Sequence, residues 1–200
     1  MKATYKGFEA KKSGGFIELP PVGAYVGEIQ AAREAEQNGR PVIELFMEIT
    51  EGEYANRFHE VYEDQKERFG DSAKYKGIFR LVPYMDGDED WRRSTFEGNL
   101  WAVEQSNGFD ANGEPLYKWD WDEKKLKGKK VGISIRKRIY NYNGKDRETT
   151  EIGRLESINE VKAGKVKPMK DRDTRTNKSA EESTDGSEFT DVSKEVSVPW

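Results

Sequence analysis

Apolar and polar residues alternate at every second position in several segments, and this period predicts a β-rich fold. In PVIELFMEIT the odd positions from Ile43 to Ile49 are apolar, and glutamates stand among the residues between them. Such alternation is typical of a strand with one buried face. A similar run, GAYVGEIQAA, precedes it, and Asn38-Gly39 lies between the two. Because Asn-Gly favours the tight turn of a hairpin, we expect these two runs to pair.

A second and clearer hairpin is predicted around Asn143-Gly144. KVGISIRKRIYNY leads into this turn, and KDRETTEIGRLESI leads out of it. Along the first run the apolar positions share one face: Val131, Ile133, Ile135 and Ile139. The apolar parity shifts between Ile152 and Leu155, so we expect a bulge or bend at Gly153.

The remaining elements mix strand and helix. We predict a third strand over residues 57–62, which includes the single histidine, His59, as a partly exposed structural residue. Residues 72–85 carry apolar side chains at helical spacing: Tyr75, Ile78, Phe79 and Val82. A firmer helix is predicted over residues 93–109, with Ser94 and Glu97 as a capping box and Asn107-Gly108 as its end. Within it we expect four side chains to pack in the core: Phe96, Leu100, Trp101 and Val103.

These patterns divide the chain into three parts. Residues 1–21, which include Ser13-Gly14-Gly15, are predicted to form a flexible N-terminal arm. For residues 22–168 we predict a mainly β, OB-like, five-stranded and partly open barrel with inserted helices. Residues 169–200 are rich in Ser, Thr, Asp, Glu and Lys. We predict a disordered acidic tail there, because such a segment buries too little apolar surface to offset its ordering entropy.

The composition excludes several chemistries. The 200 residues include no cysteine and one histidine, which excludes disulfides, zinc–thiolate sites, thiol catalysis and His-rich metal sites. The sequence contains no phosphate-binding loop, dinucleotide-binding fingerprint or EF-hand motif. It also lacks a secretory signal and a run of about 18 apolar residues that would span a membrane. We therefore expect a cytoplasmic protein that is not an enzyme and holds no metal or cofactor.

The net charge of −4 conceals a strong partition along the chain. Residues 1–123 carry 15 Lys/Arg and 25 Asp/Glu, whereas residues 124–170 carry 15 Lys/Arg and 5 Asp/Glu. Residues 171–200 are acidic again, with 4 Lys/Arg and 8 Asp/Glu. A local excess of positive charge over one hairpin is the electrostatic pattern that polyanions seek.

The predicted 130–156 hairpin combines this charge with aromatic side chains. Arg136, Arg138, Tyr140 and Tyr142 share the strand face opposite the apolar one. Cations neutralise phosphates and flat rings stack on unpaired bases, so the combination favours single-stranded nucleic acid over a duplex. We expect the nucleic-acid-binding residues to be Lys129, Lys130, Arg136, Lys137, Arg138, Tyr140, Tyr142, Arg147 and Trp121.

Two tryptophan clusters leave alternatives open. Trp119 and Trp121 project to one side of an extended segment, where they either stack on bases or cap the edge of the core. Trp91 stands with two arginines beside the acidic DGDED, and this cluster is a weaker candidate for the same chemistry.

The C-terminus predicts a partner-binding tip. After a run of polar and acidic residues the chain ends in VSVPW. An apolar tip with a free carboxylate suits a pocket on another protein. We expect the contacts with that partner to come from Asp191, Val198, Pro199 and Trp200.

Taken together, these features resemble single-stranded DNA-binding proteins of the OB-fold type. ITEGEYANRF and LKGKKVGI, within residues 22–168, resemble phage and prophage replication-region proteins of Gram-positive bacteria, some of which are considered single-stranded DNA-binding proteins. In the OB-fold family an acidic tail ending in Pro and an aromatic residue recruits replication and repair partners. The resemblance implies no catalytic residues.

The sequence thus predicts non-catalytic binding of single-stranded DNA in phage or prophage replication or recombination. In that case we expect the protein to work in the cytoplasm of a bacterial host. Its tail binds replication or recombination proteins. The protein either forms a homo-oligomer or acts alone. Two alternatives stay open at this point. The first alternative is a protein–protein adaptor of a phage replication complex that does not bind DNA itself. The second is a metal-dependent nuclease.

Overall fold

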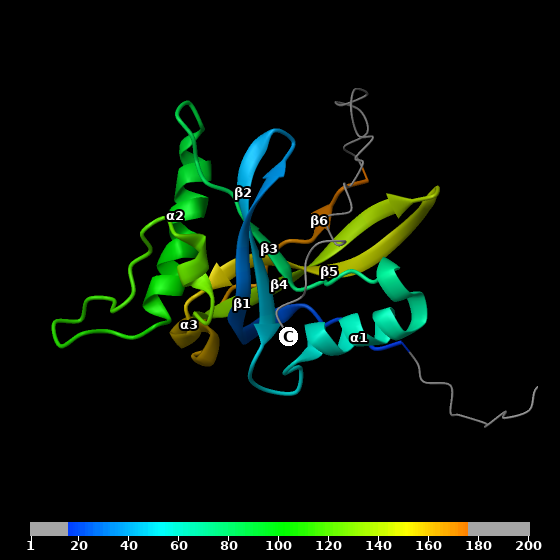
Figure 1. The fold of residues 1–200 in the computed structure, drawn as a ribbon, viewed down its shortest axis with the longest axis horizontal. Coiled ribbons are helices and arrows are strands. Elements are labelled where there is room, and N and C mark those ends of the chain that lie inside the picture. Colours follow the sequence, from blue (N-terminus) through cyan, green and yellow to red (C-terminus); the bar gives the residue numbers. More distant parts are fainter. Residues whose placement is uncertain (1–15, 176–200) are drawn as a thin grey trace, which may run out of the picture.

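The computed structural model describes residues 16–175 and shows a mainly β protein with one antiparallel main sheet and a few helices. Five strands are hydrogen-bonded in the order β3-β2-β1-β4-β5, and the sheet is not closed (Figure 1). The strands are β1 (Gly23–Gln37), β2 (Arg40–Ile49), β3 (Ile78–Leu81), β4 (Lys130–Tyr142), β5 (Lys145–Glu156) and β6 (Arg172–Asp173). The α-helices are α1 (Arg57–Phe69), α2 (Asp90–Gln105) and α3 (Ile158–Lys162), with short 3₁₀ turns η1 (Gly70–Ser72) and η2 (Glu123–Leu126).

Both predicted hairpins are confirmed. Asn38 and Gly39 join β1 to β2 with φ values of 53° and 72°, and Asn143 and Gly144 join β4 to β5 with φ values of 51° and 75°. Two consecutive positive φ angles define the turn whose twist matches that of paired strands. The two hairpins project in different directions from a shared base, where β1 pairs with β4 (Figure 1).

The core fills the concave side of this sheet. Residues of odd number point inward on β2, at the start of β4 and on β1 as far as Ile29, where a bulge shifts the register. Ile29, Leu45, Met47 and Ile133 have no solvent exposure. α2 packs against β4 and β5 through Phe96, Ala102 and Val103, which are 1–2% exposed. On the open side of the sheet β3 approaches β5 without pairing with it.

The strand predicted over residues 57–62 is wrong, because these residues begin α1. The buried Glu48 of β2 accepts hydrogen bonds from the backbone N–H groups of Phe58 (3.1 Å) and His59 (2.7 Å). These are first-turn N–H groups that have no partner inside the helix. A carboxylate distant in sequence thus caps α1, and His59 lies half-buried on a helix.

The helical spacing of residues 72–85 is also misleading, since Ile78–Leu81 form β3. Phe79 and Leu81 alternate with half-buried neighbours and pair with Leu45 and Ile43 of β2. Just before this strand, Tyr75 packs on the outer face of β2 against Phe46 and α1. Packing on both faces of β2 therefore sets the conformation of this segment, and local periodicity does not.

The helix predicted over residues 93–109 is confirmed, but it begins earlier, at Asp90. Ser94 consequently lies inside α2 and is not its cap. Phe96 and Val103 are buried as expected, and Leu100 packs against the core. Trp101 does not, because its side chain is 49% exposed on the outer face of α2.

The bulge expected at Gly153 is confirmed. The β4–β5 register changes from Ser134 opposite Arg154 to Ile135 opposite Ile152, which leaves Gly153 unpaired. A Cβ on Gly153 would lie 2.7 Å from the sulfur of Met169, so the glycine lets the later chain cross closely over β5. Residues 169–175 follow, and among them β6 pairs with β4.

The N-terminal side shows similar packing. Pro20 is buried, and its carbonyl accepts a 3.0 Å hydrogen bond from the Thr150 hydroxyl of β5. Most of the predicted arm, residues 1–15, lies outside the described residues, as does the tail from residue 176 onward. Within residues 16–175 no helix is long and apolar enough to cross a membrane.

Candidate nucleic-acid interface

The face of the β4–β5 hairpin that was predicted from sequence carries three arginines around one carboxylate. Arg136 donates to Glu151 at 2.9 Å, Arg172 of β6 lies 3.5 Å from the same carboxylate, and Arg138 lies 3.9 Å from it. Their side chains are 24%, 51% and 42% exposed, respectively, whereas that of Glu151 is 20% exposed. We call this group the Glu151 cluster; it retains a net charge of +2 on a surface open to solvent.

Two tyrosines extend the Glu151 cluster toward the hairpin turn. The Arg138 guanidinium lies 5.6 Å from the centre of the Tyr140 ring, and Tyr142 at the tip is 61% exposed. Arg147 and Lys145 of β5 lie opposite these tyrosines in the β4–β5 register and are exposed. In an antiparallel pair, directly opposed residues share a face, so cations and rings line one surface of the hairpin.

A further cation, Lys76, approaches Arg138 of the Glu151 cluster from the segment before β3. Lys74 and Lys76 are exposed. The pKa of Lys76 is lowered, first by partial desolvation of its ammonium group and then by the positive charges of Lys74 and Arg138. The smaller, electrostatic part of this shift shows that Lys76 lies close enough to Arg138 for their positive charges to repel each other.

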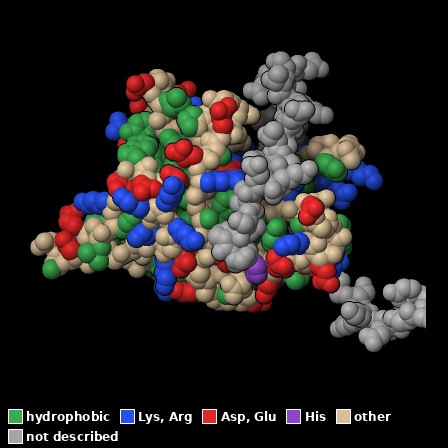
Figure 2. Space-filling model, in the orientation of Figure 1, with side chains coloured by type: hydrophobic (Ala, Val, Ile, Leu, Met, Phe, Trp, Pro, Cys, Tyr) green, Lys and Arg blue, Asp and Glu red, His purple; other side chains and the backbone are tan. Residues whose placement is uncertain are grey.

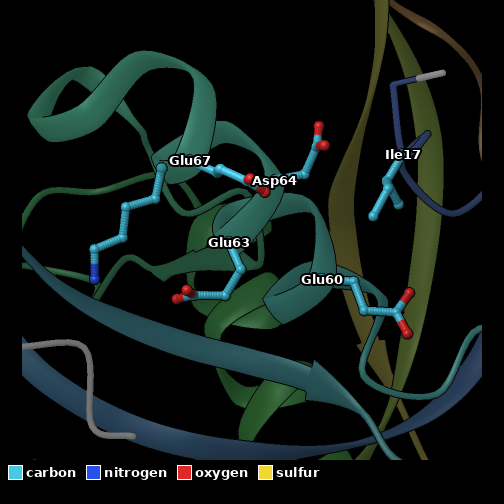
Figure 3. Close-up of a pocket in the computed structure, with 6 residues that line it drawn as sticks. Ile17, Glu60, Glu63, Asp64 and Glu67 are labelled. Atoms are coloured by element: carbon cyan, nitrogen blue, oxygen red, sulfur yellow. The ribbon is translucent and has the colours of Figure 1, made fainter. Parts of the chain in front are cut away.

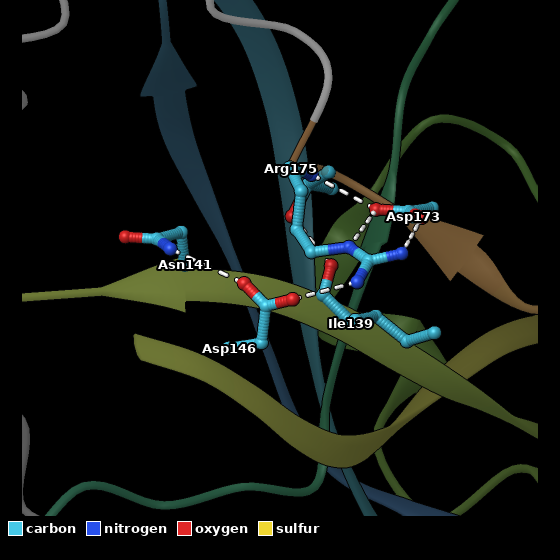
Figure 4. Close-up of polar contacts among 6 residues, drawn as sticks. Ile139, Asn141, Asp146, Asp173 and Arg175 are labelled. Carbon is cyan, nitrogen blue, oxygen red and sulfur yellow. Dashed lines mark hydrogen bonds and ion pairs between the residues drawn. The ribbon is translucent and has the colours of Figure 1, made fainter. Parts of the chain in front are cut away.

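The last described residues strap the chain to the same hairpin (Figure 4). Thr174 donates its backbone N–H to the Ile139 carbonyl at 2.9 Å, and Arg175 pairs with Asp146 of β5 at 2.7 Å. Hydrogen bonds from Arg175 lower the pKa of Asp173 to about 2. Arg175 thus pairs with two carboxylates, Asp146 and Asp173, and offsets one of their two negative charges, while the Glu151 cluster keeps its own excess of positive charge.

The structure does not bring all predicted binding residues together. Lys137 lies on the opposite face of β4 and pairs with Glu148 at 3.1 Å. Lys129 and Lys130 stand at the start of β4, roughly 25 Å along the strand from Arg138 at 3.3 Å per residue. Lys129 lies over the ring of Tyr117, with its ammonium 4.1 Å from the ring centre.

Trp121 also lies apart from the hairpin. Its ring stacks on Phe96 of α2 with a centroid distance of 5.6 Å, and it is 61% exposed. Trp119 caps the core edge, because it packs against the core and its indole N–H donates to the Asp122 carbonyl at 2.9 Å. α2 and the tip of the β4–β5 hairpin lie on opposite sides of the molecule (Figure 1). The predicted tail contacts at Asp191, Val198, Pro199 and Trp200 lie outside the described residues.

A shallow acidic pocket lies elsewhere, between α1 and the segment that precedes β1 (Figure 3). Its volume is about 530 Å³, and it is lined by Ile17, Glu60, Glu63, Asp64, Lys66 and Glu67. Within residues 16–175 no group of three or more His, Asp or Glu side chains is arranged to hold a metal ion.

Sequence patterns missed Lys76 and Arg172, which reach the Glu151 cluster from other parts of the chain. Alternation within one strand identifies residues on that strand, but only the strand pairing and the return of residues 172–175 show these additional cations. Figure 2 shows Lys and Arg side chains gathered at the outer end of the β4–β5 hairpin. No family model matches this chain, and no curated protein matches its sequence.

Proposed function

We propose that the chain is a non-catalytic, OB-like protein that binds single-stranded DNA along the β4–β5 hairpin. The strand order β3-β2-β1-β4-β5, with α2 between β3 and β4, supports the OB-like part of the proposal. OB-folds are five-stranded, partly open barrels that bind oligonucleotides on a strand face flanked by the first and last hairpin loops. The approach of β3 to β5 is the side on which such a barrel is partly open.

The observation that carries the proposal is the excess of cations in the Glu151 cluster beside exposed rings. Three guanidiniums share one carboxylate, and Tyr140 and Tyr142 continue the same face. Phosphates would pair with the arginines while unpaired bases stack on the tyrosines. A duplex hides its base faces, so the rings favour a single strand.

The biological setting belongs to the same proposal. We place the protein in phage or prophage replication or recombination, in the cytoplasm of a bacterial host. The C-terminal Pro199-Trp200 then recruits a partner protein of the same process. The charge pattern supports separate roles for the two regions, DNA binding by the hairpin and partner binding by the C-terminal segment, because the hairpin is basic and the C-terminal segment is acidic.

The test is a titration with fluorescent oligo-dT at several salt concentrations. We expect the affinity to fall with salt, and each phosphate contact adds about 0.7 to the slope of log affinity against log salt for a single strand. Replacing both Arg138 and Arg172 by alanine should lower that slope and weaken binding by about tenfold or more. The matched control is Lys118→Ala, an exposed cation on the loop after α2.

Stacking is tested separately from charge. Tyr140→Ala should weaken oligo-dT binding by about 1–3 kcal/mol, whereas Tyr140→Phe should keep most of the affinity because it keeps the ring. Phe69→Ala, at an exposed aromatic residue on α1, serves as the control. No binding at low salt, equal loss in the control variants, or Mg²⁺-dependent degradation of the oligonucleotide would contradict the proposal.

A further inference from the structure

The outer face of α2 carries two exposed tryptophans with small residues between them. Trp91 is 55% exposed and Trp101 is 49% exposed, while Ser94 and Gly98 are also exposed. At about 100° per residue these four positions fall within about 80° of one another, on an exposed stripe that borders the buried face of α2 at Ala102. Hydrophobic side chains gather over the first turns of α2 in Figure 2. Exposed apolar side chains that form one contiguous patch often mark a site of protein–protein contact.

The four positions have an internal symmetry. Trp91 and Trp101 lie equally far from position 96 along α2, and so do Ser94 and Gly98. If two copies of α2 pack antiparallel about a two-fold axis at this position, Trp91 faces Trp101 of the second copy. Ser94 then faces Gly98 of the second copy. A surface that complements itself in this way is what a two-fold dimer requires.

The small residues decide how closely two copies can approach. A Cβ added to Gly98 would meet no atom within 4 Å, so this position is an open notch in the helix surface. Packed helices lie about 8–10 Å apart, and small side chains at the crossing allow the shorter distance. The tryptophans on either side would then close over the crossing point.

The charges beside the stripe fit the same arrangement. Arg93 and Glu97 form an ion pair at 2.8 Å, with side chains 61% and 52% exposed. A two-fold axis near position 96 places Arg93 opposite position 99 of the second copy, two residues from Glu97. At a rise of 1.5 Å per residue, the two charges are then less than one helical turn apart along the helix axis. Each arginine can therefore exchange its own glutamate for that of the second copy.

We propose that α2 is the interface of a homodimer, centred on Ser94 and Gly98 and sealed by Trp91 and Trp101. A nucleic acid is a poor occupant of this face, because four acidic residues precede Trp91 within residues 86–90. The dimer is independent of the proposed DNA binding, since α2 lies away from the tip of the β4–β5 hairpin (Figure 1).

The first test is sedimentation equilibrium of the full chain from about 1 to about 100 µM, a range that brackets a micromolar dissociation constant. We expect the mass to rise from 23.0 kDa toward the dimer. Gly98→Arg should fill the notch and raise the dissociation constant at least about tenfold. Its melting temperature should stay level or rise, because glycine is a poor helix former. Gly98→Ala is the matched control and should keep the dimer.

The second test concerns the charges. Arg93→Glu should weaken the dimer by placing like charges across the axis, and adding Glu97→Arg should restore it. Oligo-dT affinity per chain, measured in parallel at low concentration, reports the DNA-binding proposal separately. A wild-type protein that stays monomeric, a dimer that survives Gly98→Arg, or a double charge swap no better than the single one would overturn the α2 interface.

Discussion

The two long hairpins of this protein carry the same ionic motif and use it differently. On the β1–β2 side the carboxylate of Glu44 forms ion pairs with the guanidiniums of Arg33, at 2.6 Å, and Arg80, at 2.8 Å. On the β4–β5 side Glu151 is surrounded by three arginines in the Glu151 cluster. Both carboxylates sit on a strand next to an Asn-Gly turn, so the difference between the two motifs arises from what surrounds them.

Burial and charge count separate the two motifs. The Glu44 side chain is 7% exposed, and Arg33 lies over the ring of the buried Phe46 at 5.2 Å from its centre. The Glu151 side chain is 20% exposed, its cluster carries one more cation, and the neighbouring Tyr142 ring faces solvent. The comparison teaches that the same arginine–carboxylate motif can be a buried contact within the fold or an exposed surface with a larger excess of positive charge, and the second is the surface that we propose binds DNA.

The largest expected effect is on stability, and it tests the first half of the comparison. Glu44→Ala leaves two partly buried guanidiniums without their carboxylate and should lower the free energy of unfolding by about 2–4 kcal/mol. Glu151→Ala should cost less than about 1 kcal/mol, because its partners are more exposed and screened by solvent. Urea unfolding at pH 7 measures both losses. Equal losses would contradict the distinction between the two motifs.

A smaller loss of stability is expected from Glu48, through which the β1–β2 hairpin caps the first turn of α1. Glu48→Gln replaces one acceptor oxygen by an N–H group facing the first turn of α1 and should cost about 1–3 kcal/mol. Burial raises the pKa of Glu48 above its ordinary value of 4.5. The native state therefore holds this proton to higher pH than the unfolded chain does.

The sign of the pH dependence follows from that difference. The stability of the wild-type protein should fall as the pH rises from 4.5 through the raised pKa, and the glutamine variant should lack this fall. The cost of Glu48→Gln is then smaller at pH 7 than at pH 4, as urea unfolding at both values would show. A cost that grows with pH would mean that the pKa of Glu48 is lowered.

The smallest effect tests the second half of the comparison and has the opposite direction. Glu151→Gln removes the single negative charge from the Glu151 cluster, so oligo-dT affinity at low salt should rise by about 3–10-fold. The control is Glu148→Gln, which removes an exposed charge on the opposite face of the same hairpin. An unchanged or weakened affinity in Glu151→Gln would place the DNA elsewhere.

Local patterns predicted the parts of the fold that local chemistry controls. Asn38-Gly39 and Asn143-Gly144 specify both turns because their residues tolerate positive φ, and alternation specifies which face of each strand is buried. The face with Arg136, Arg138 and Tyr140 was predicted for the same reason. Gly153 was predicted as a bulge because the apolar parity changes there.

The errors share one cause, which is contact between residues far apart in sequence. Residues 57–62 form a helix because Glu48, ten and eleven residues before Phe58 and His59, accepts hydrogen bonds from their N–H groups in the first turn of α1. Residues 78–81 form a strand because β2 offers a free edge. Trp121 and Lys129 were assigned to the binding face by composition, but they lie beside α2 and Tyr117.

By itself, the sequence determined the two hairpins, the buried face of each strand and a cationic, aromatic surface on the second hairpin. These depend on backbone preferences and two-residue periodicity, which act between neighbours. Only the tertiary structure decided which arginines share a carboxylate, that Lys76 and Arg172 join Arg138, and that Trp91 and Trp101 remain exposed on one helix face. Charge balance and burial depend on distances between segments remote in the chain, and those distances exist only once the sheet has formed.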